Sequence, residues 1–201
     1  MPAATPAAFF ASLRVIGQAF EGYLICESAE SLLVIDQHAA HERVAFERLR
    51  RAYADGGVAR QRLLVPAVVD VGAQAAPLLA DALAELENLG FELEPFGGNS
   101  FAVRAVPALL SDGDPTTLVR DLAEELTDIG RSRRLAEAAE SVLARLACHS
   151  AVRVGQSLDA EQIRALLVAM DQADFAGNCP HGRPAFITLP RSDLERLFKR
   201  T

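Results

Sequence analysis

The sequence predicts a mixed fold of strands and helices in which the two ends of the chain flank a separate acidic unit. Short apolar runs with strand character occur near both ends, and apolar residues at helical spacing occur between them. Residues 61–130 carry 3 basic and 12 acidic side chains, a net charge of −9, whereas residues 1–60 have a net charge of −1 and residues 131–201 of +3. With 201 residues, half of them hydrophobic, the chain can bury a core as one domain or two small ones.

Composition excludes several classes of protein. No apolar run is long enough to cross a bilayer, so no membrane partner is expected. No charged and then apolar leader is present, so secretion is not expected. The three cysteines, Cys26, Cys148 and Cys179, are odd in number and far apart, which favours a reducing compartment over a disulfide scaffold. The formal net charge of −7 argues against binding nucleic acid by bulk electrostatics.

The first part of the chain is expected to form a short strand meander followed by a helix. Residues 1–11 are uncharged and rich in alanine and proline, which is typical of a linker. The strands are expected at residues 13–20, 23–26 and 31–35. The helix should begin near residue 39, reach Tyr53 and end at Asp55-Gly56-Gly57.

The acidic middle should alternate between strands and helices. A strand is expected after Pro66, a helix over residues 74–89, two strands joined by a hairpin turn at Gly97-Gly98-Asn99, and a helix over residues 115–129. On this last helix Asp121, Glu124 and Glu125 are expected to face outward.

The last part of the chain should contain helices, one loop and one strand. A long helix is expected from about residue 135 through His149, and a second from Ser157-Leu158-Asp159 to about Gln172. Residues 177–184 have the composition of a loop, residues 185–189 that of a strand, and residues 193–198 that of a closing helix.

A metal site is one interpretation of the junction between the third strand and the first long helix. Asp36 follows the strand, and His38 and Glu42 are four residues apart, hence neighbours on one helical face. Imidazole and carboxylate together can hold a metal ion. The alternative is an ordinary capped helix with Asp36 near its N-terminus and His38 at the surface.

The loop residues Cys179 and His181 offer a second half for such a site. Thiolate and imidazole ligands favour zinc, and with His38 and Glu42 they would complete a four-ligand shell. Alternatively, Cys179 is a small buried residue and His181 a turn residue. Cys148 is best explained as a core cysteine late in a helix, unless it faces Asp36 and Cys179.

The order and spacing of these residues resemble the C-terminal region of the MutL family of DNA mismatch-repair proteins. The resemblance covers the chain from about Leu13 to its end. It rests on an endonuclease signature, a second motif, the start of a third and the basic tail, namely Asp36-Gln37-His38-Ala39 with Glu42 and Glu47, Cys179-Pro180-His181-Gly182-Arg183-Pro184, Ala147-Cys148, and Phe198-Lys199-Arg200. Where the third motif often continues with Arg or Lys, this chain has His149.

The resemblance implies an α+β fold with two subdomains. Residues 12–54 and 145–201 would form a dimerisation and endonuclease subdomain, a small antiparallel sheet with helices. Residues 55–144 would form an inserted external α/β regulatory subdomain. The charge distribution points to a similar division.

The resemblance also implies a metal-dependent endonuclease that nicks duplex DNA. The metal ligands would be Asp36, His38, Glu42, Cys148, Cys179 and His181, with Asp36 and Glu42 catalytic. His38, Glu42, Cys179 and His181 suit Zn²⁺, whereas Asp36, helped by Glu42 and Cys148, suits a more labile Mn²⁺ or Mg²⁺. Glu47 would either orient ligands or stay on the helix surface, and Arg183 would either contact phosphate or form a structural ion pair.

A further segment resembles the motif by which bacterial members engage the replication sliding clamp. Gln61 would anchor it by hydrogen bonding, and Leu64 and Pro66 would enter an apolar groove. The alternative is an ordinary edge strand, because the motif is short.

Two other functions remain open beside a clamp-licensed nuclease that forms a homodimer. One is a dimerisation module whose zinc is only structural, and the other is a zinc-binding fold without a role on DNA. The resemblance implies a bacterial protein of the cytoplasm, associated with the nucleoid. This region is expected to bind DNA only weakly by itself. It would contact the mismatch-recognition protein MutS through the full-length protein.

Overall fold

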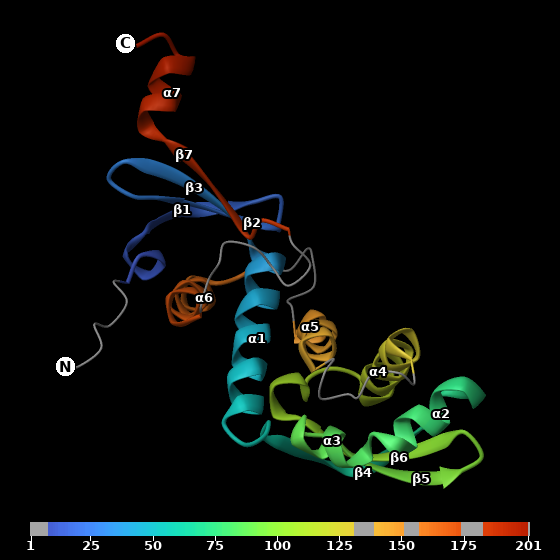
Figure 1. Cartoon of the computed structure of the whole chain (residues 1–201). Helices are drawn as coiled ribbons and strands as arrows, with labels where there is room; N and C mark the ends of the chain where they lie inside the picture. Colours follow the sequence, from blue (N-terminus) through green and yellow to red (C-terminus); the bar gives the residue numbers. More distant parts are fainter. Residues whose placement is uncertain (1–7, 131–138, 151–156, 174–182, 201) are drawn as a thin grey trace, which may run out of the picture. The chain divides into compact units, whose positions relative to one another are not determined.

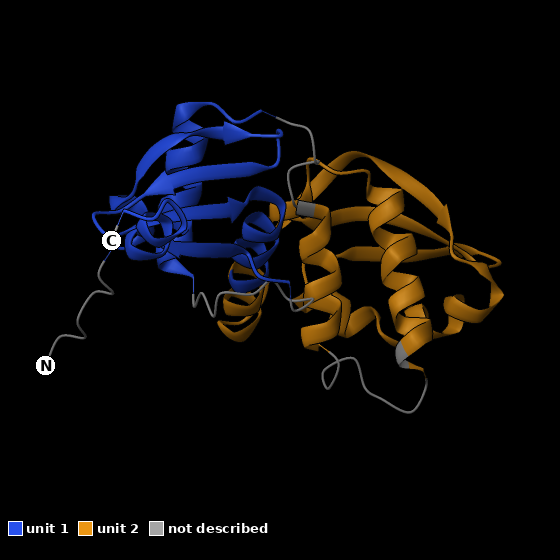
Figure 2. Cartoon of the chain, turned by 90° about the horizontal axis from the view of Figure 1, so that it is seen from above, with its two compact units in different colours: residues 1–47, 151–201 blue, residues 48–150 orange. Residues whose placement is uncertain are grey.

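The computed structural model describes residues 8–130, 139–150, 157–173 and 183–200. The chain divides into two compact units, which Figure 2 distinguishes by colour. Unit 1 comprises residues 1–47 and 151–201, and unit 2 comprises residues 48–150. Both units combine a small antiparallel sheet with helices, so the α+β expectation is confirmed.

Unit 1 is built on a four-stranded antiparallel sheet with the order β1-β2-β3-β7 (Figure 1). The first three strands form the expected meander, and the last comes from the far end of the chain and pairs with β3. The strands are β1 (Arg14–Ala19), β2 (Tyr23–Glu27), β3 (Ser31–Asp36) and β7 (Phe186–Pro190). This pairing places residues side by side that are as far apart in the sequence as Ser31 and Pro190.

One face of this sheet packs against helices and forms the core of unit 1. Helix α1 (Gln37–Ala54) begins in this unit, and α6 (Ala160–Gln172) and the short α7 (Arg191–Leu197) follow later in the chain. The core contains side chains from β2, β3, the first turns of α1, and α6, among them Leu24, Cys26, Leu33, Ile35, Ala40, Val44, Ile163, Leu167 and Met170. Helix α6 begins with a capping box at Asp159, close to the start expected from its sequence.

The predicted linker over residues 1–11 is too long at its C-terminal end. Residues Phe10–Ser12 form a short 3₁₀ helix, η1, and the Phe10 side chain is buried. The cause lies far away in the sequence, because the Asp171 carboxylate accepts hydrogen bonds from the backbone N–H groups of Phe9, Phe10 and Ala11. Residues 1–7 lie outside the described part of the chain.

Unit 2 contains a three-stranded antiparallel sheet with the order β4-β6-β5. Its strands are β4 (Arg60–Asp70), β5 (Glu92–Gly97) and β6 (Ser100–Pro107), and η2 (Ala108–Leu110) is a single 3₁₀ turn. Its helices are α2 (Gly72–Asp81), α3 (Leu83–Asn88), α4 (Pro115–Ile129) and α5 (Ala139–Ser150). Helix α4 packs against α2, α5 and β4.

Three expectations for the helices and strands of unit 2 need correction. The helix expected over residues 74–89 is two helices, because the chain tightens at Ala82, whose N–H bonds the carbonyl of Leu79. Pro66 does not begin a strand but lies inside β4, in the stretch between Arg62 and Ala67 where the pairing with β6 shifts register. Of the acidic residues of α4, Glu124 is exposed as expected, whereas Asp121 is partly buried and pairs with His149 of α5.

No described helix is both long enough and apolar enough to cross a membrane.

Candidate metal centre

Asp36 is the last residue of β3 and also caps the helix that follows. Its backbone N–H donates to the carbonyl of Ala185, which precedes β7, at 2.9 Å. Its Oδ1 accepts a hydrogen bond from the N–H of Ala39 at 3.0 Å. The helix therefore begins at Gln37, two residues earlier than expected, and the capping alternative holds locally. Capping occupies one carboxylate oxygen, and a carboxylate has acceptor sites enough to bind a cation as well.

His38 and Glu42 lie one turn apart on the first turns of α1 and face each other. The His38 Nε2 is 3.2 Å from the Glu42 Oε1, and the two side chains are 34% and 8% exposed. Two ligands of one tetrahedral zinc ion, at ordinary Zn–N and Zn–O bond lengths, stand about 3.4 Å apart. The pair thus fits two corners of a zinc shell without rearrangement of the helix.

Glu47 is buried and does not lie on the helix surface as one alternative had it. Its Oε1 is 2.7 Å from the Nη2 of Arg43, one turn earlier on α1. A buried carboxylate held by a guanidinium has a fixed orientation. Glu47 and Arg43 therefore pair across the turn of α1 that follows Glu42.

Of the remaining sequence-predicted ligands, one lies in the other unit and two lie outside the described residues. Cys148 belongs to unit 2, on the last turn of α5, where its Sγ donates to the carbonyl of Ala144 at 3.4 Å. Cys179 and His181 lie outside the described residues, and Arg183 is described and exposed. Within the described ranges, no group of three His, Cys, Asp or Glu side chains is placed to hold a metal ion.

The segment expected to engage a sliding clamp lies on β4, an edge strand of the unit 2 sheet. Its pairing with β6 shifts register between Arg62 and Ala67. Leu64 is fully exposed there, Val65 nearly so, and Gln61 and Pro66 are exposed as well. An exposed apolar bulge on a sheet edge is a surface suited to an extended partner groove.

Sequence reasoning missed Gln37 as a structural member of this junction. The side chain is buried, and its Nε2 finds no hydrogen-bond partner among the described residues. Its backbone N–H donates to Gly22, and its carbonyl contacts the His41 Nδ1 at 2.7 Å. In the sequence, the sign of this structural role is that an amide side chain, that of Gln37, stands directly between Asp36 and His38.

Comparison with known proteins gives one consistent family. The family model described as the MutL C terminal dimerisation domain matches residues 16–158. Three similar relatives, each named DNA mismatch repair protein MutL, come from Geotalea daltonii, Pelobacter propionicus and Anaeromyxobacter dehalogenans. Their identities are 47% over 192 residues, 46% over 200 and 46% over 196, covering 96%, 100% and 97% of this chain.

The alignments cover 32%, 33% and 32% of those relatives, so the chain spans about one third of their length. The matched region extends over parts of both units. The chain therefore belongs to the MutL C-terminal dimerisation domain family.

Proposed function

We propose that this chain is a metal-dependent endonuclease region that nicks duplex DNA as part of a mismatch-repair MutL protein. The observation that carries the proposal is the junction of β3 and α1. There the carboxylate of Asp36 stands at the end of a strand. The imidazole of His38 and the carboxylate of Glu42 follow on the helix, one turn apart from each other. Such a set matches the ligand chemistry of a hydrolytic metal site.

In the proposed site His38 and Glu42 would hold Zn²⁺ together with Cys179 and His181. Asp36, with Glu42 and Cys148, would hold Mn²⁺ or Mg²⁺, because hard oxygen ligands suit those ions. A bound divalent ion supplies an activated water and neutralises charge on the scissile phosphate. Asp36 would bind the ion through the carboxylate oxygen that does not accept the Ala39 N–H at the start of α1, and Arg183 is a candidate phosphate contact.

Nicking of supercoiled plasmid in Mn²⁺ tests the nuclease. The variant Asp36→Asn should lose nicking by about 100-fold or more, as expected when a ligand of a catalytic metal is neutralised. The matched control is Asp70→Asn, because Asp70 also ends a strand and its Oδ1 also accepts a backbone N–H, from Gly72 at 2.8 Å. Equal activity of wild type and Asp36→Asn would refute the nuclease, as would inactivity of both with the clamp supplied.

A dimerisation module with structural zinc is the second candidate, favoured by the family description and by the close fit of the His38–Glu42 pair to zinc. Metal analysis of the purified chain should find about one zinc per chain, lost in Cys179→Ser. Zinc retention together with absence of Mn²⁺-dependent nicking would favour this second candidate. Absence of zinc from the wild type would count against both.

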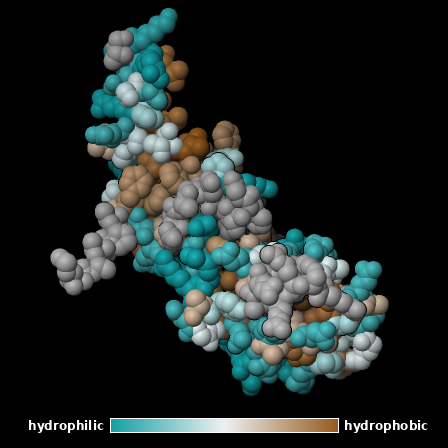
Figure 3. Space-filling view, in the orientation of Figure 1, coloured by the Kyte–Doolittle hydropathy of each residue, from teal (hydrophilic) through white to brown (hydrophobic). Residues whose placement is uncertain are grey.

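We assign self-association to the outer face of the unit 1 sheet. Its inner face is filled by helices, whereas its outer rows are apolar in the aligned positions Ile25, Val34 and Ile187, with Tyr23 nearby. Ile187 is 51% exposed, and hydrophobic atoms gather over these strands in Figure 3. Because the family is one of dimerisation domains, a second copy of the chain is the partner expected to cover this apolar face.

Light scattering after size exclusion tests this surface. Wild type should be a dimer, and Ile187→Glu should be a monomer at micromolar concentration. The control is Val68→Glu on β4, because Val68 is 49% exposed on a strand of unit 2. A dimeric Ile187→Glu protein, or a monomeric control, would place the interface elsewhere.

The clamp assignment rests on the exposed bulge of β4. We expect Leu64→Ser to weaken clamp binding by at least tenfold, since a buried leucine anchor contributes about 2 kcal/mol. Because Leu64 is fully exposed in this chain, the same change should leave folding untouched. Unchanged clamp affinity in Leu64→Ser would favour the alternative, in which β4 is an ordinary edge strand.

Binding to DNA should be weak for this region alone, because its net charge is −7. DNA and MutS would then be engaged mainly through the remainder of a full-length protein, in the bacterial cytoplasm near the nucleoid. In this scheme unit 2 serves as the regulatory subdomain. Submicromolar, salt-resistant DNA binding by the isolated chain would contradict the first of these expectations.

A further inference from the structure

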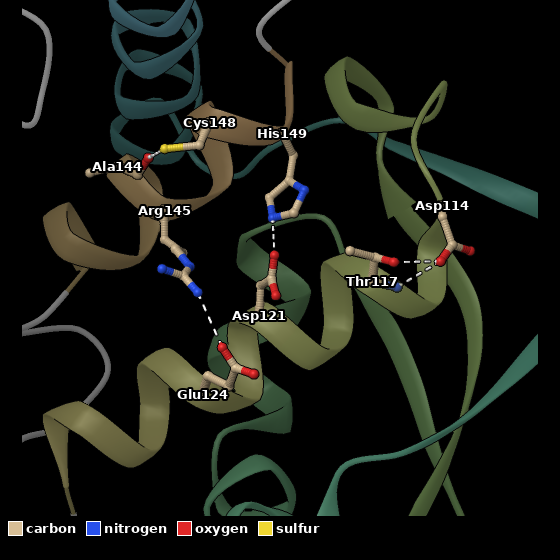
Figure 4. A network of polar contacts seen from close by, with 8 residues as sticks. All are labelled: Asp114, Thr117, Asp121, Glu124, Ala144, Arg145, Cys148 and His149. Carbon is tan, nitrogen blue, oxygen red and sulfur yellow. Dashed lines mark hydrogen bonds and ion pairs between the residues drawn. The ribbon is translucent and has the colours of Figure 1, made fainter. Parts of the chain in front are cut away.

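Helices α4 and α5 of unit 2 are joined by three polar contacts at four-residue spacing along α5. Ser141 bonds Glu125, the Arg145 Nη2 is 3.2 Å from the Glu124 Oε2, and the His149 Nε2 is 2.7 Å from the Asp121 Oδ2. Figure 4 shows the second and third of these contacts from close by. Residues 141, 145 and 149 share one helical face, so α5 meets α4 along a single polar row.

The three contacts differ in position and exposure. The Arg145–Glu124 side chains are 41% and 67% exposed, and those of His149 and Asp121 only 20% and 26%. The less exposed pair lies at the C-terminal turn of α5, the part of a helix that frays most readily. A short, part-buried contact at a fraying end restrains the backbone more than an exposed pair does.

Cys148 occupies this same turn, next to His149. Its Sγ donates to the carbonyl of Ala144, so its orientation depends on the last turn of α5 staying helical. The side chain of His149, on that turn, contacts Asp121 of α4.

We propose that Asp121, acting through His149, is a positioning residue that fixes the orientation of the Cys148 thiol. The link to metal binding rests on the proposed function, in which Cys148 is a ligand. The positioning itself does not, because it concerns only the last turn of α5. In this proposal the acidic helix α4 helps to hold the Cys148 thiol in place, a role that the charge of the helix alone did not indicate.

The first test measures the rate at which a maleimide labels Cys148 in metal-free Cys179→Ser protein. Cys26 is fully buried, and burial raises the pKa of its thiol, so it should stay unlabelled. Asp121→Asn and His149→Leu should speed labelling about five- to tenfold, as a frayed turn releases the thiol. The matched control, Glu124→Gln, removes the neighbouring contact between the same helices and should change the rate less than about twofold.

A conservative variant separates positioning from general stability. His149→Arg keeps an N–H donor opposite Asp121 and should label as slowly as the parent protein. Unchanged labelling in Asp121→Asn, or equal acceleration by Glu124→Gln, overturns the inference.

The second test measures Mn²⁺ affinity of the otherwise unaltered chain, by the paramagnetic resonance signal of the unbound ion. Asp121→Asn should weaken binding about tenfold, the lower end of the effect of residues that orient metal ligands. Faster labelling with unchanged Mn²⁺ affinity would uphold the positioning role and remove Cys148 from the proposed ligand set. The two proposals can therefore fail separately.

Discussion

Units 1 and 2 differ most clearly in where they keep their charges. Among the described residues, the buried polar or charged side chains are Gln37, Glu42 and Glu47, all in unit 1 on the first turns of α1. Unit 2 contains the acidic stretch of the sequence, yet none of its described charged side chains is buried. Burying a carboxylate destabilises a fold unless a partner compensates it, and here Glu47 pairs with Arg43 and Glu42 lies against His38.

The two histidine–carboxylate pairs show the same contrast. His38 and Glu42 lie on one helix and present an imidazole and a nearly buried carboxylate together. His149 and Asp121 come from two helices and join them. The same two side-chain types thus lie on one helix in unit 1, where we propose a metal ion, and join two helices in unit 2, and only the fold distinguishes them.

The largest effect should come from emptying the core of unit 2. Phe91 is fully buried, and Phe91→Ala should destabilise the unit by about 3–5 kcal/mol through lost burial and a residual cavity. Hydrogen exchange should accelerate in β4, β5 and β6. If the units are stable by themselves, exchange in β1–β3 should stay unchanged, and Leu24→Ala in unit 1 should give the opposite pattern. Acceleration in both sheets by either variant would show one cooperative unit.

The buried ion pair of unit 1 should be the next most sensitive feature. Arg43→Met leaves Glu47 buried without its guanidinium and should lower the free energy of unfolding by about 3 kcal/mol. The chain provides a matched control in Arg191–Glu195, which has the same spacing and order but is exposed. Arg191→Met should cost less than about 0.5 kcal/mol. Similar urea midpoints for the two variants would show that burial of Glu47 has no special consequence.

Asp171 should have an intermediate effect, confined to unit 1. Its carboxylate accepts backbone N–H groups of Phe9, Phe10 and Ala11 at 2.9, 2.8 and 2.7 Å. Asn has one acceptor oxygen, so Asp171→Asn should lose part of this set and about 1–3 kcal/mol of stability. The amides of residues 9–11 should then exchange rapidly, while those of α4 and α5 should not change. Retained protection at residues 9–11 would contradict this account of η1.

The Asp171 contact also shows where sequence reasoning reaches its limit. The β1–β3 meander and the strand-to-helix step at Asp36 were predictable, because alternation of apolar residues and capping act between near neighbours. Residues 9–11 were assigned to a linker because their anchor is 160 residues away. The outward orientation predicted for Asp121 was wrong for the same reason, since its partner is on another helix. Helical periodicity also did not reveal the break at Ala82.

The smallest effect on stability should come from the cap of helix α4 in unit 2, and it should depend on pH. Asp114 caps α4, and hydrogen bonds from the hydroxyls of Thr116 and Thr117 lower its pKa from the ordinary 3.8 to about 2. At neutral pH, Asp114→Ala should cost about 1 kcal/mol, a typical value for losing an N-cap. Because the folded pKa lies below the unfolded one, this stabilisation is complete above about pH 4 and is lost as pH falls through 2. Urea midpoints of wild type and Asp114→Ala should therefore converge between pH 4 and pH 2, and the control Asp112→Ala should match wild type throughout. A constant gap down to pH 2 would show that the cap acts without its charge.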